Sequence, residues 1–102
     1  MEIIFFDNSV KKILENLESR TRAKVFRLTN LLKEFGENLR MPYSKRIEKN
    51  LFELRVRGQQ EVRIFYAFKN GAILLHAFVK KTQRTPIKEL KNARRKLRSL
   101  DV

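Results

Sequence analysis

The first third of the chain combines a short apolar run with two stretches of helical periodicity. Residues 2–6 (EIIFF) favour a strand, and Asp7-Asn8-Ser9 is a cluster suited to capping a helix. Apolar side chains then recur at helical spacing over residues 9–18, and again from Ser19 to Phe35. The pattern predicts two adjacent amphipathic helices, with Ser19 capping the second and Gly36 ending it in the left-handed conformation.

The middle of the chain changes from helical to strand periodicity. Between Gly36 and Asn50 no period is visible, and we predict a loop. Apolar and other residues then alternate in three segments, Leu51–Arg57, Val62–Phe68 and Ala72–Lys80. Asn70-Gly71 is a strong hairpin signal, because a type I′ turn needs positive φ at both central residues. These segments therefore predict an antiparallel meander.

A last helix is predicted to begin at Thr85-Pro86, with Thr85 as the N-cap and Pro86 as the first helical residue. Its apolar stripe consists of Ile87, Leu90, Ala93, Leu97 and Leu100. The predicted order is β-α-α-β-β-β-α. This is an α+β fold in which a helical hairpin packs on an antiparallel sheet and the C-terminal helix is basic.

Alternation also predicts which strand side chains share a face. Phe52, Leu54 and Val56 are expected to face the helical hairpin, and so are Ile73 and Leu75 of the last strand. The opposite face then collects basic and aromatic side chains: Arg55, Arg57, Arg63, Phe65, His76, Phe78 and Lys80. Such a set suits RNA, because guanidinium groups bind phosphate and aromatic rings stack on bases. The alternative is a ladder of surface charge whose two phenylalanines are covered by the last helix.

Composition strengthens the case for a polyanionic partner. The 102 residues, about the length of one domain, include 24 Lys and Arg against 11 Asp and Glu, a formal net charge of +13. The segment from Lys80 to Arg98 is the most basic, although a charge run can also be a solvated helix face. The absence of cysteine fits a reducing compartment. No apolar run is long enough to span a membrane, and MEIIFFDN carries an acid where a secretory signal would carry lysines, so we expect a cytoplasmic protein and no membrane partner.

The residues available for catalysis restrict the chemistry. One histidine and no cysteine make a zinc site or a two-metal nuclease site a poor expectation, and no glycine-rich phosphate loop is present. We therefore expect neither a metal nor another cofactor. Chemistry on phosphate would then act on RNA, whose 2′-OH is an internal nucleophile that needs orientation, proton transfer and nearby cations.

Four segments carry a family resemblance. They are MPYSK at 41–45, LFELR at 51–55, VRIFY at 62–66 and HAFVKKTQRTP at 76–86, and the last is the most specific. With the predicted order of elements, they resemble the RelE/ParE toxin superfamily and, within it, the phage-derived, HigB-like group. The resemblance covers nearly the whole chain and implies one RelE-like toxin domain over residues 1–102.

This resemblance implies the toxin of a type II toxin–antitoxin system. Such a toxin is a metal-independent endoribonuclease that cuts mRNA on the ribosome and thereby inhibits translation. A cognate helix-turn-helix antitoxin, HigA-like in this group, holds it inactive. Operator DNA would be bound only through the complex of toxin and antitoxin.

The shared strand face and this resemblance together give roles to individual residues, and the resemblance itself singles out Arg55, Arg57, Arg63, Lys80 and Lys81. The catalytic candidates are Arg55, Arg63, Lys81 and His76. The candidates for RNA binding are Arg57, Lys80, Lys45, Arg84, Phe65 and Phe78. RelE uses a tyrosine in its C-terminal segment, and this chain has no tyrosine after Tyr66. The proton-transfer role is therefore open among His76, Lys81 and Tyr43.

Two other functions remain as alternatives. A ParE-like inhibitor would bind DNA gyrase as a protein partner and have no nuclease activity. The joint presence of Arg55, Arg63 and Lys81 favours the endoribonuclease over the gyrase inhibitor. Plain DNA binding through the basic last helix is weaker still, because that helix uses Ile87, Leu90 and Leu97 for docking and lacks a helix-turn-helix partner.

Overall fold

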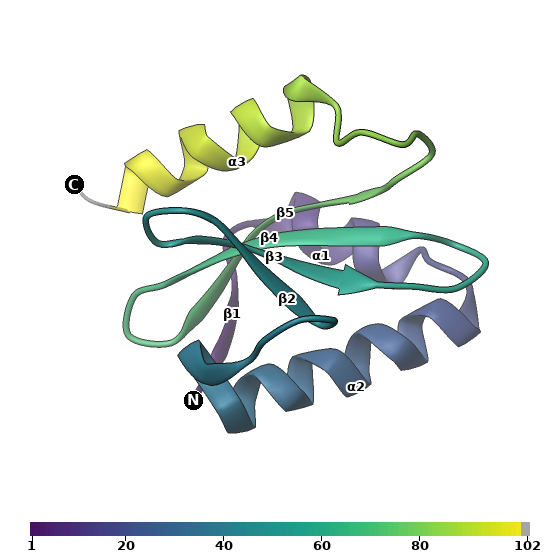
Figure 1. The fold of residues 1–102 in the computed structure, drawn as a ribbon, viewed down its shortest axis with the longest axis horizontal. Coiled ribbons are helices and arrows are strands. Elements are labelled where there is room, and N and C mark those ends of the chain that lie inside the picture. Colours follow the sequence, from purple (N-terminus) through teal and green to yellow (C-terminus); the bar gives the residue numbers. More distant parts are fainter. Residues whose placement is uncertain (101–102) are drawn as a thin grey trace.

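The computed structural model describes residues 1–100, so the last two residues of the predicted 1–102 domain lie outside it. Figure 1 shows three α-helices around a central sheet. The elements are β1 (Ile3–Phe5), α1 (Asn8–Glu15), α2 (Ser19–Phe35), a 3-10 turn η1 (Gly36–Asn38), β2 (Ser44–Glu48), β3 (Leu51–Val56), β4 (Val62–Phe68), β5 (Ala72–Val79) and α3 (Ile87–Leu100). This α+β architecture is consistent with a RelE-like fold. None of the helices within residues 1–100 has the length and apolar character needed to cross a membrane.

The sheet has five strands in the order β1-β5-β4-β3-β2. Strands β2 to β5 form the predicted antiparallel meander, but β1 pairs with β5 in parallel. The prediction of a wholly antiparallel sheet is therefore wrong, and the sheet is mixed. Strand β1 is held from both sides, because Ile3 packs in the layer under α1 and α2 while Ile4 packs in the layer under α3.

The strand β2 was not predicted, because residues 36–50 were expected to be a loop. Three of its five residues are charged, which hides the alternation typical of a buried strand. Such a composition suits the edge of a sheet, where charged side chains discourage further strand pairing. One residue anchors the strand inward: Ser44 is buried and its hydroxyl lies 2.5 Å from the hydroxyl of Tyr66 on β4.

The helical hairpin follows the prediction with small shifts. Asp7 caps α1, and its carboxylate accepts a hydrogen bond from the backbone N–H of Val10. This helix ends at Glu15, earlier than the predicted residue 18. The N-cap of α2 is Glu18 rather than Ser19, and Gly36 has a φ of 54° with a ψ of −128°, so it is not in the left-handed helical region.

The turn at Asn70-Gly71 is as predicted, with positive φ of 55° and 137° at the two residues. The facing of β5 is only partly as predicted. A bulge pairs Phe65 with His76 but Tyr66 with Leu74, so Leu75 is an extra residue on β5. Ile73 and Leu75 consequently pack under α3 instead of under the helical hairpin.

Helix α3 covers the face of the sheet opposite α1 and α2 (Figure 1). It begins at Ile87, because the carbonyl of Pro86 accepts the N–H groups of Glu89 and Leu90. Pro86 is thus the residue before the helix rather than its first residue. Ile87 is 71% exposed and does not belong to the docking stripe, which is formed by Leu90, Ala93, Leu97 and Leu100.

Candidate active site

Two arginines face each other across adjacent strands on the side of the sheet opposite α2. Arg55 on β3 pairs with Arg63 on β4, and Glu53 lies two residues before Arg55 on the same face. The predicted convergence of these arginines is therefore observed. Strand pairing brings them together because alternate residues of each strand project to one side.

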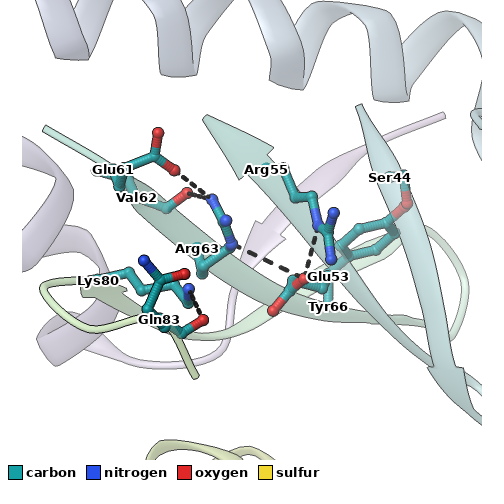
Figure 2. A network of polar contacts seen from close by, with 9 residues as sticks. All are labelled: Ser44, Glu53, Arg55, Glu61, Val62, Arg63, Tyr66, Lys80 and Gln83. Carbon is teal, nitrogen blue, oxygen red and sulfur yellow. Dashed lines mark hydrogen bonds and ion pairs between the residues drawn. The ribbon is translucent and has the colours of Figure 1, made fainter. Parts of the chain in front are cut away.

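A buried carboxylate lies between the two guanidinium groups, as Figure 2 shows. Glu53 Oε1 accepts a hydrogen bond from Arg55 Nε at 2.9 Å and lies 3.8 Å from Arg63 Nε. Glu53 and Arg63 are 3% and 4% exposed. Arg63 also donates through Nη1 to Glu61 at 3.0 Å. These contacts offset the repulsion between the arginines and fix the direction of both side chains.

Arg63 lines a basic hollow beside the start of β4 and the end of β5. The hollow has a volume of about 560 Å³ and is lined by Arg57, Glu61, Arg63, Lys80, Lys81, Thr82 and Gln83. Hydrogen bonds hold its rim, because Lys80 Nζ donates to the carbonyl of Gln83 at 2.7 Å and the Lys80 N–H donates to the carbonyl of Glu61 at 2.6 Å. Four cationic side chains against one carboxylate make this hollow suitable for an anion such as phosphate.

Arg55 borders a second hollow on the other side of Arg57. This hollow has a volume of about 470 Å³ and is lined by Lys24, Arg27, Leu28, Leu31, Pro42, Tyr43, Arg55, Val56 and Arg57. Tyr43 is exposed, and its carbonyl accepts the N–H of Arg55 at 2.8 Å. Arg57 lines both hollows, so they lie on either side of it: the basic hollow borders Arg63, and the second hollow borders α2.

The histidine predicted to be catalytic lines neither hollow. His76 is on β5 beneath α3, where its Nε2 lies 3.1 Å from Glu89 Oε1 and its ring is stacked near Phe78. In the register of the sheet, Phe65 separates His76 from Glu53. Lys81 therefore lies beside Arg63 in the basic hollow and Tyr43 beside Arg55 in the second hollow, whereas His76 contacts Glu89 beneath α3.

Phe65 and Phe78, which were expected to contact bases, are covered. They are 1% and 7% exposed, their ring centroids lie 5.9 Å apart, and they pack in the layer with Ala93 and Leu97 of α3. In this conformation the apolar stripe of α3 occupies the space that a base would need. The expectation that these two rings are accessible to bases is therefore wrong, and the alternative of coverage by the last helix is correct.

The remaining candidates for RNA binding are dispersed. Lys45 is exposed on β2, directly across from Glu53. Arg84 is exposed on the segment between β5 and α3, where its carbonyl accepts the hydroxyl of Thr82. Both extend the positive surface without lining the basic hollow.

Sequence reasoning missed the neighbours that complete the hollow. Glu61, Thr82 and Gln83 were not assigned a role, although Glu61 lies two residues before Arg63 and so projects to the same side. Tyr66 belongs to the opposite layer of the sheet, where burial raises the pKa of its hydroxyl against the opposing effect of the bond with Ser44. Among residues 1–100, no group of three or more His, Asp or Glu side chains is placed to hold a metal ion.

The fold and the site together define a small, strongly basic α+β protein with a cationic surface suited to a phosphate-bearing ligand. The chain matches the family described as phage derived protein Gp49-like (DUF891) over residues 12–98. It therefore belongs to this family, a phage-derived, toxin–antitoxin-like family of the RelE/ParE-like toxin superfamily. No curated protein matches the chain at a significant level.

Proposed function

We propose that this chain is a HigB-like toxin that cuts mRNA on the ribosome. The observation that supports the proposal is the pair Arg55 and Arg63, aligned by Glu53, with Lys81 lining the same hollow as Arg63. Membership of a toxin–antitoxin-like family supports it further and suggests an antitoxin partner. We infer that this partner is a HigA-like helix-turn-helix protein and that operator DNA is bound only through their complex.

In the proposed reaction the 2′-OH of the RNA attacks the adjacent phosphorus. A new P–O2′ bond forms, the P–O5′ bond breaks, and the proton of the 2′-OH passes to a base while the leaving 5′-oxygen gains a proton. The products are a 2′,3′-cyclic phosphate and a 5′-OH end. Atoms and charge balance without an oxidant, a reductant or a metal-bound nucleophile.

The arginines carry N–H donors that could stabilise the negative charge that develops on the phosphate. Both arginines approach Glu53 through Nε, with a hydrogen bond from Arg55 and an ion pair from Arg63, and the Nη groups of Arg55 make no hydrogen bond to residues 1–100. These Nη groups would bind the non-bridging oxygens, and Arg63 would support them from the neighbouring strand. Because the side chains are held by Glu53 and Glu61 before RNA binds, little reorganisation is required.

Proton transfer is proposed for Lys81 and Tyr43 rather than for His76. Lys81 lines the hollow with Arg63, and Tyr43 lines the hollow with Arg55. His76 contacts Glu89 beneath α3, so it would have to change partner before reaching RNA. A group that moves the proton must lie within hydrogen-bonding reach of the reacting oxygen.

Induced expression followed by mapping of mRNA 5′ ends tests the proposal. We expect translation to stop within minutes and cuts to appear inside translated regions only. Continued translation together with damage to supercoiled DNA would instead favour the ParE-like inhibition of gyrase. The Arg55→Ala variant, expressed to the same level, is the control for cuts that arise from host nucleases.

A further inference from the structure

A third hollow lies on the opposite layer of the molecule, between β1 and the helical hairpin. It has a volume of about 450 Å³ and a floor of the buried side chains Leu14, Val25 and Leu74. Its lining and that of the basic hollow beside Arg63 share none of residues 1–100. A ligand bound here would therefore leave Arg63 and Lys81 uncovered.

Two exposed phenylalanines line this hollow. Phe26 of α2 is 67% exposed and Phe5 of β1 is 42% exposed. Phe26 follows Val25 and lies outside the buried stripe of α2, so its ring gains little from folding. Single exposed apolar residues are common, but two aromatic rings from distant segments beside one apolar floor are typical of a protein-binding surface.

The charged residues at the rim of the hollow indicate what charge a partner would carry. Lys11, Arg22 and Lys33 line it together with one carboxylate, Glu15. The backbone carbonyl of Glu15, rather than its carboxylate, accepts a hydrogen bond from Arg22 Nη1 at 3.1 Å. A second copy of this chain would bring another excess of positive charge, +13 in total, to the same place. The charge balance therefore excludes self-association as the preferred use of this surface.

We propose that the hollow binds an acidic amphipathic segment of a partner protein. Apolar side chains of that segment would pack between Phe5 and Phe26, above the floor of Leu14 and Val25. Its carboxylates would pair with Lys11 and Lys33 at the rim. Helices with one apolar and one charged face commonly bind in grooves of this kind. The inference does not depend on the chain cleaving RNA.

Two synthetic helical peptides with identical leucines test this inference on the full-length chain. One carries glutamate and the other lysine at every polar position, and each is titrated while backbone amide NMR signals are recorded. We expect only the glutamate peptide to shift the amides of β1 and of residues 22–30. The Phe26→Ser variant should bind it about tenfold or more weakly, since a phenyl ring is no longer buried.

The matched control is Phe35→Ser, because Phe35 is also exposed on α2, at 47%, but lies outside this hollow. It should bind the glutamate peptide as tightly as the unchanged chain. Equal binding by Phe26→Ser, or shifts that gather around Arg57 and Lys81 instead, would overturn the inference. A short single-stranded RNA that shifts the Phe5 and Phe26 amides would also overturn it, in favour of a nucleic-acid surface.

Discussion

At the scale of single residues, Glu53 combines burial with contact to two arginines. Its carboxylate is almost inaccessible and lies against Nε of Arg55 and Arg63. Glu53→Gln keeps the shape of the side chain but removes the charge that balances both guanidinium groups. We expect the free energy of unfolding to fall by about 1–3 kcal/mol, the usual cost of losing a buried hydrogen bond to a charged group. Urea denaturation followed by circular dichroism measures this change.

Glu61→Gln is the matched control for that measurement. Glu61 also pairs with Arg63, at 3.0 Å, but its side chain is 37% exposed. Exposed ion pairs contribute less than about 1 kcal/mol, so this variant should be nearly as stable as the unchanged chain. Equal losses in the two variants would mean that Glu53 has no special part in holding the arginines.

The arginine pair could be predicted from the sequence because alternation in two strong strand patterns leaves little choice of face. The burial of Arg63 could not be predicted, because it depends on side-chain contacts with Glu53 and Glu61 that form only in the folded sheet. The contacts of basic residues on α3 could not be predicted from the sequence either. Arg94 pairs with Glu48, and Lys96 is buried beside Asp7, so both have structural contacts that the charge run alone does not reveal.

At the scale of elements, Asp7 links α1 to α3. It caps α1 and lies 3.1 Å from Lys96 Nζ of α3. The hydrogen bond from Ser9, together with those from Val10 and Lys96, lowers the pKa of Asp7 to about 2. A carboxyl group whose pKa is lower in the folded state stabilises the fold above its unfolded pKa, near 4, and loses that effect as the pH falls toward 2.

The variant Asp7→Asn tests this link, because asparagine also caps helices well but carries no charge. At pH 7 the variant should be less stable than the unchanged chain, by up to about 1 kcal/mol for a partly exposed pair. The difference should shrink between pH 4 and pH 2 in thermal unfolding curves. A difference that stays constant over this range would contradict a role for the ionised carboxylate.

The elements differ in how well the sequence predicted them, and the reason is their environment. Helix α2 and strands β3 to β5 carry strong periodic patterns, so their bounds were predicted closely, whereas α1 ends at Glu15 instead of residue 18. Strand β2 is an edge strand with charged side chains, and its pairing with β3 is a tertiary effect. The bulge at Leu75 reverses the facing of Ile73 and Leu75, and nothing in an apolar run such as AILL marks that position.

At the scale of the whole molecule, the net charge of +13 predicts strongly salt-dependent binding to ribosomal RNA. Lys91, Arg95 and Arg98 are exposed on α3 and distant in sequence from the arginine pair. Substituting each by Ala should weaken ribosome binding modestly and reduce the slope of log affinity against log salt by up to about one. Filter binding over a range of potassium concentrations measures both quantities. An unchanged slope in all three variants would show that α3 does not face the RNA.

The proposed chemistry depends on Arg55 and Arg63 acting on one phosphate. Arg63→Ala would remove the partner of Glu61 and one of the two arginines beside the buried Glu53, so Arg63→Lys is the better variant. It keeps the charge but loses the planar guanidinium fork. Losing such a contact in the transition state lowers rates by about 10²–10³-fold. Arg95→Lys on α3 provides the matched control, because Arg95 is exposed and far along the chain from the pair.

Single-turnover cleavage of mRNA on programmed ribosomes, with chemical analysis of the new ends, is the most direct test of this account. The unchanged chain and Arg95→Lys should cut at similar rates and yield 5′-OH ends with 2′,3′-cyclic phosphate or its 3′-phosphate hydrolysis product. Arg55→Lys and Arg63→Lys, which both keep a positive charge beside Glu53, should be slower by about two orders of magnitude or more while remaining folded. Cleavage at the unchanged rate by both arginine variants, or products with 5′-phosphate ends, would contradict the proposed mechanism.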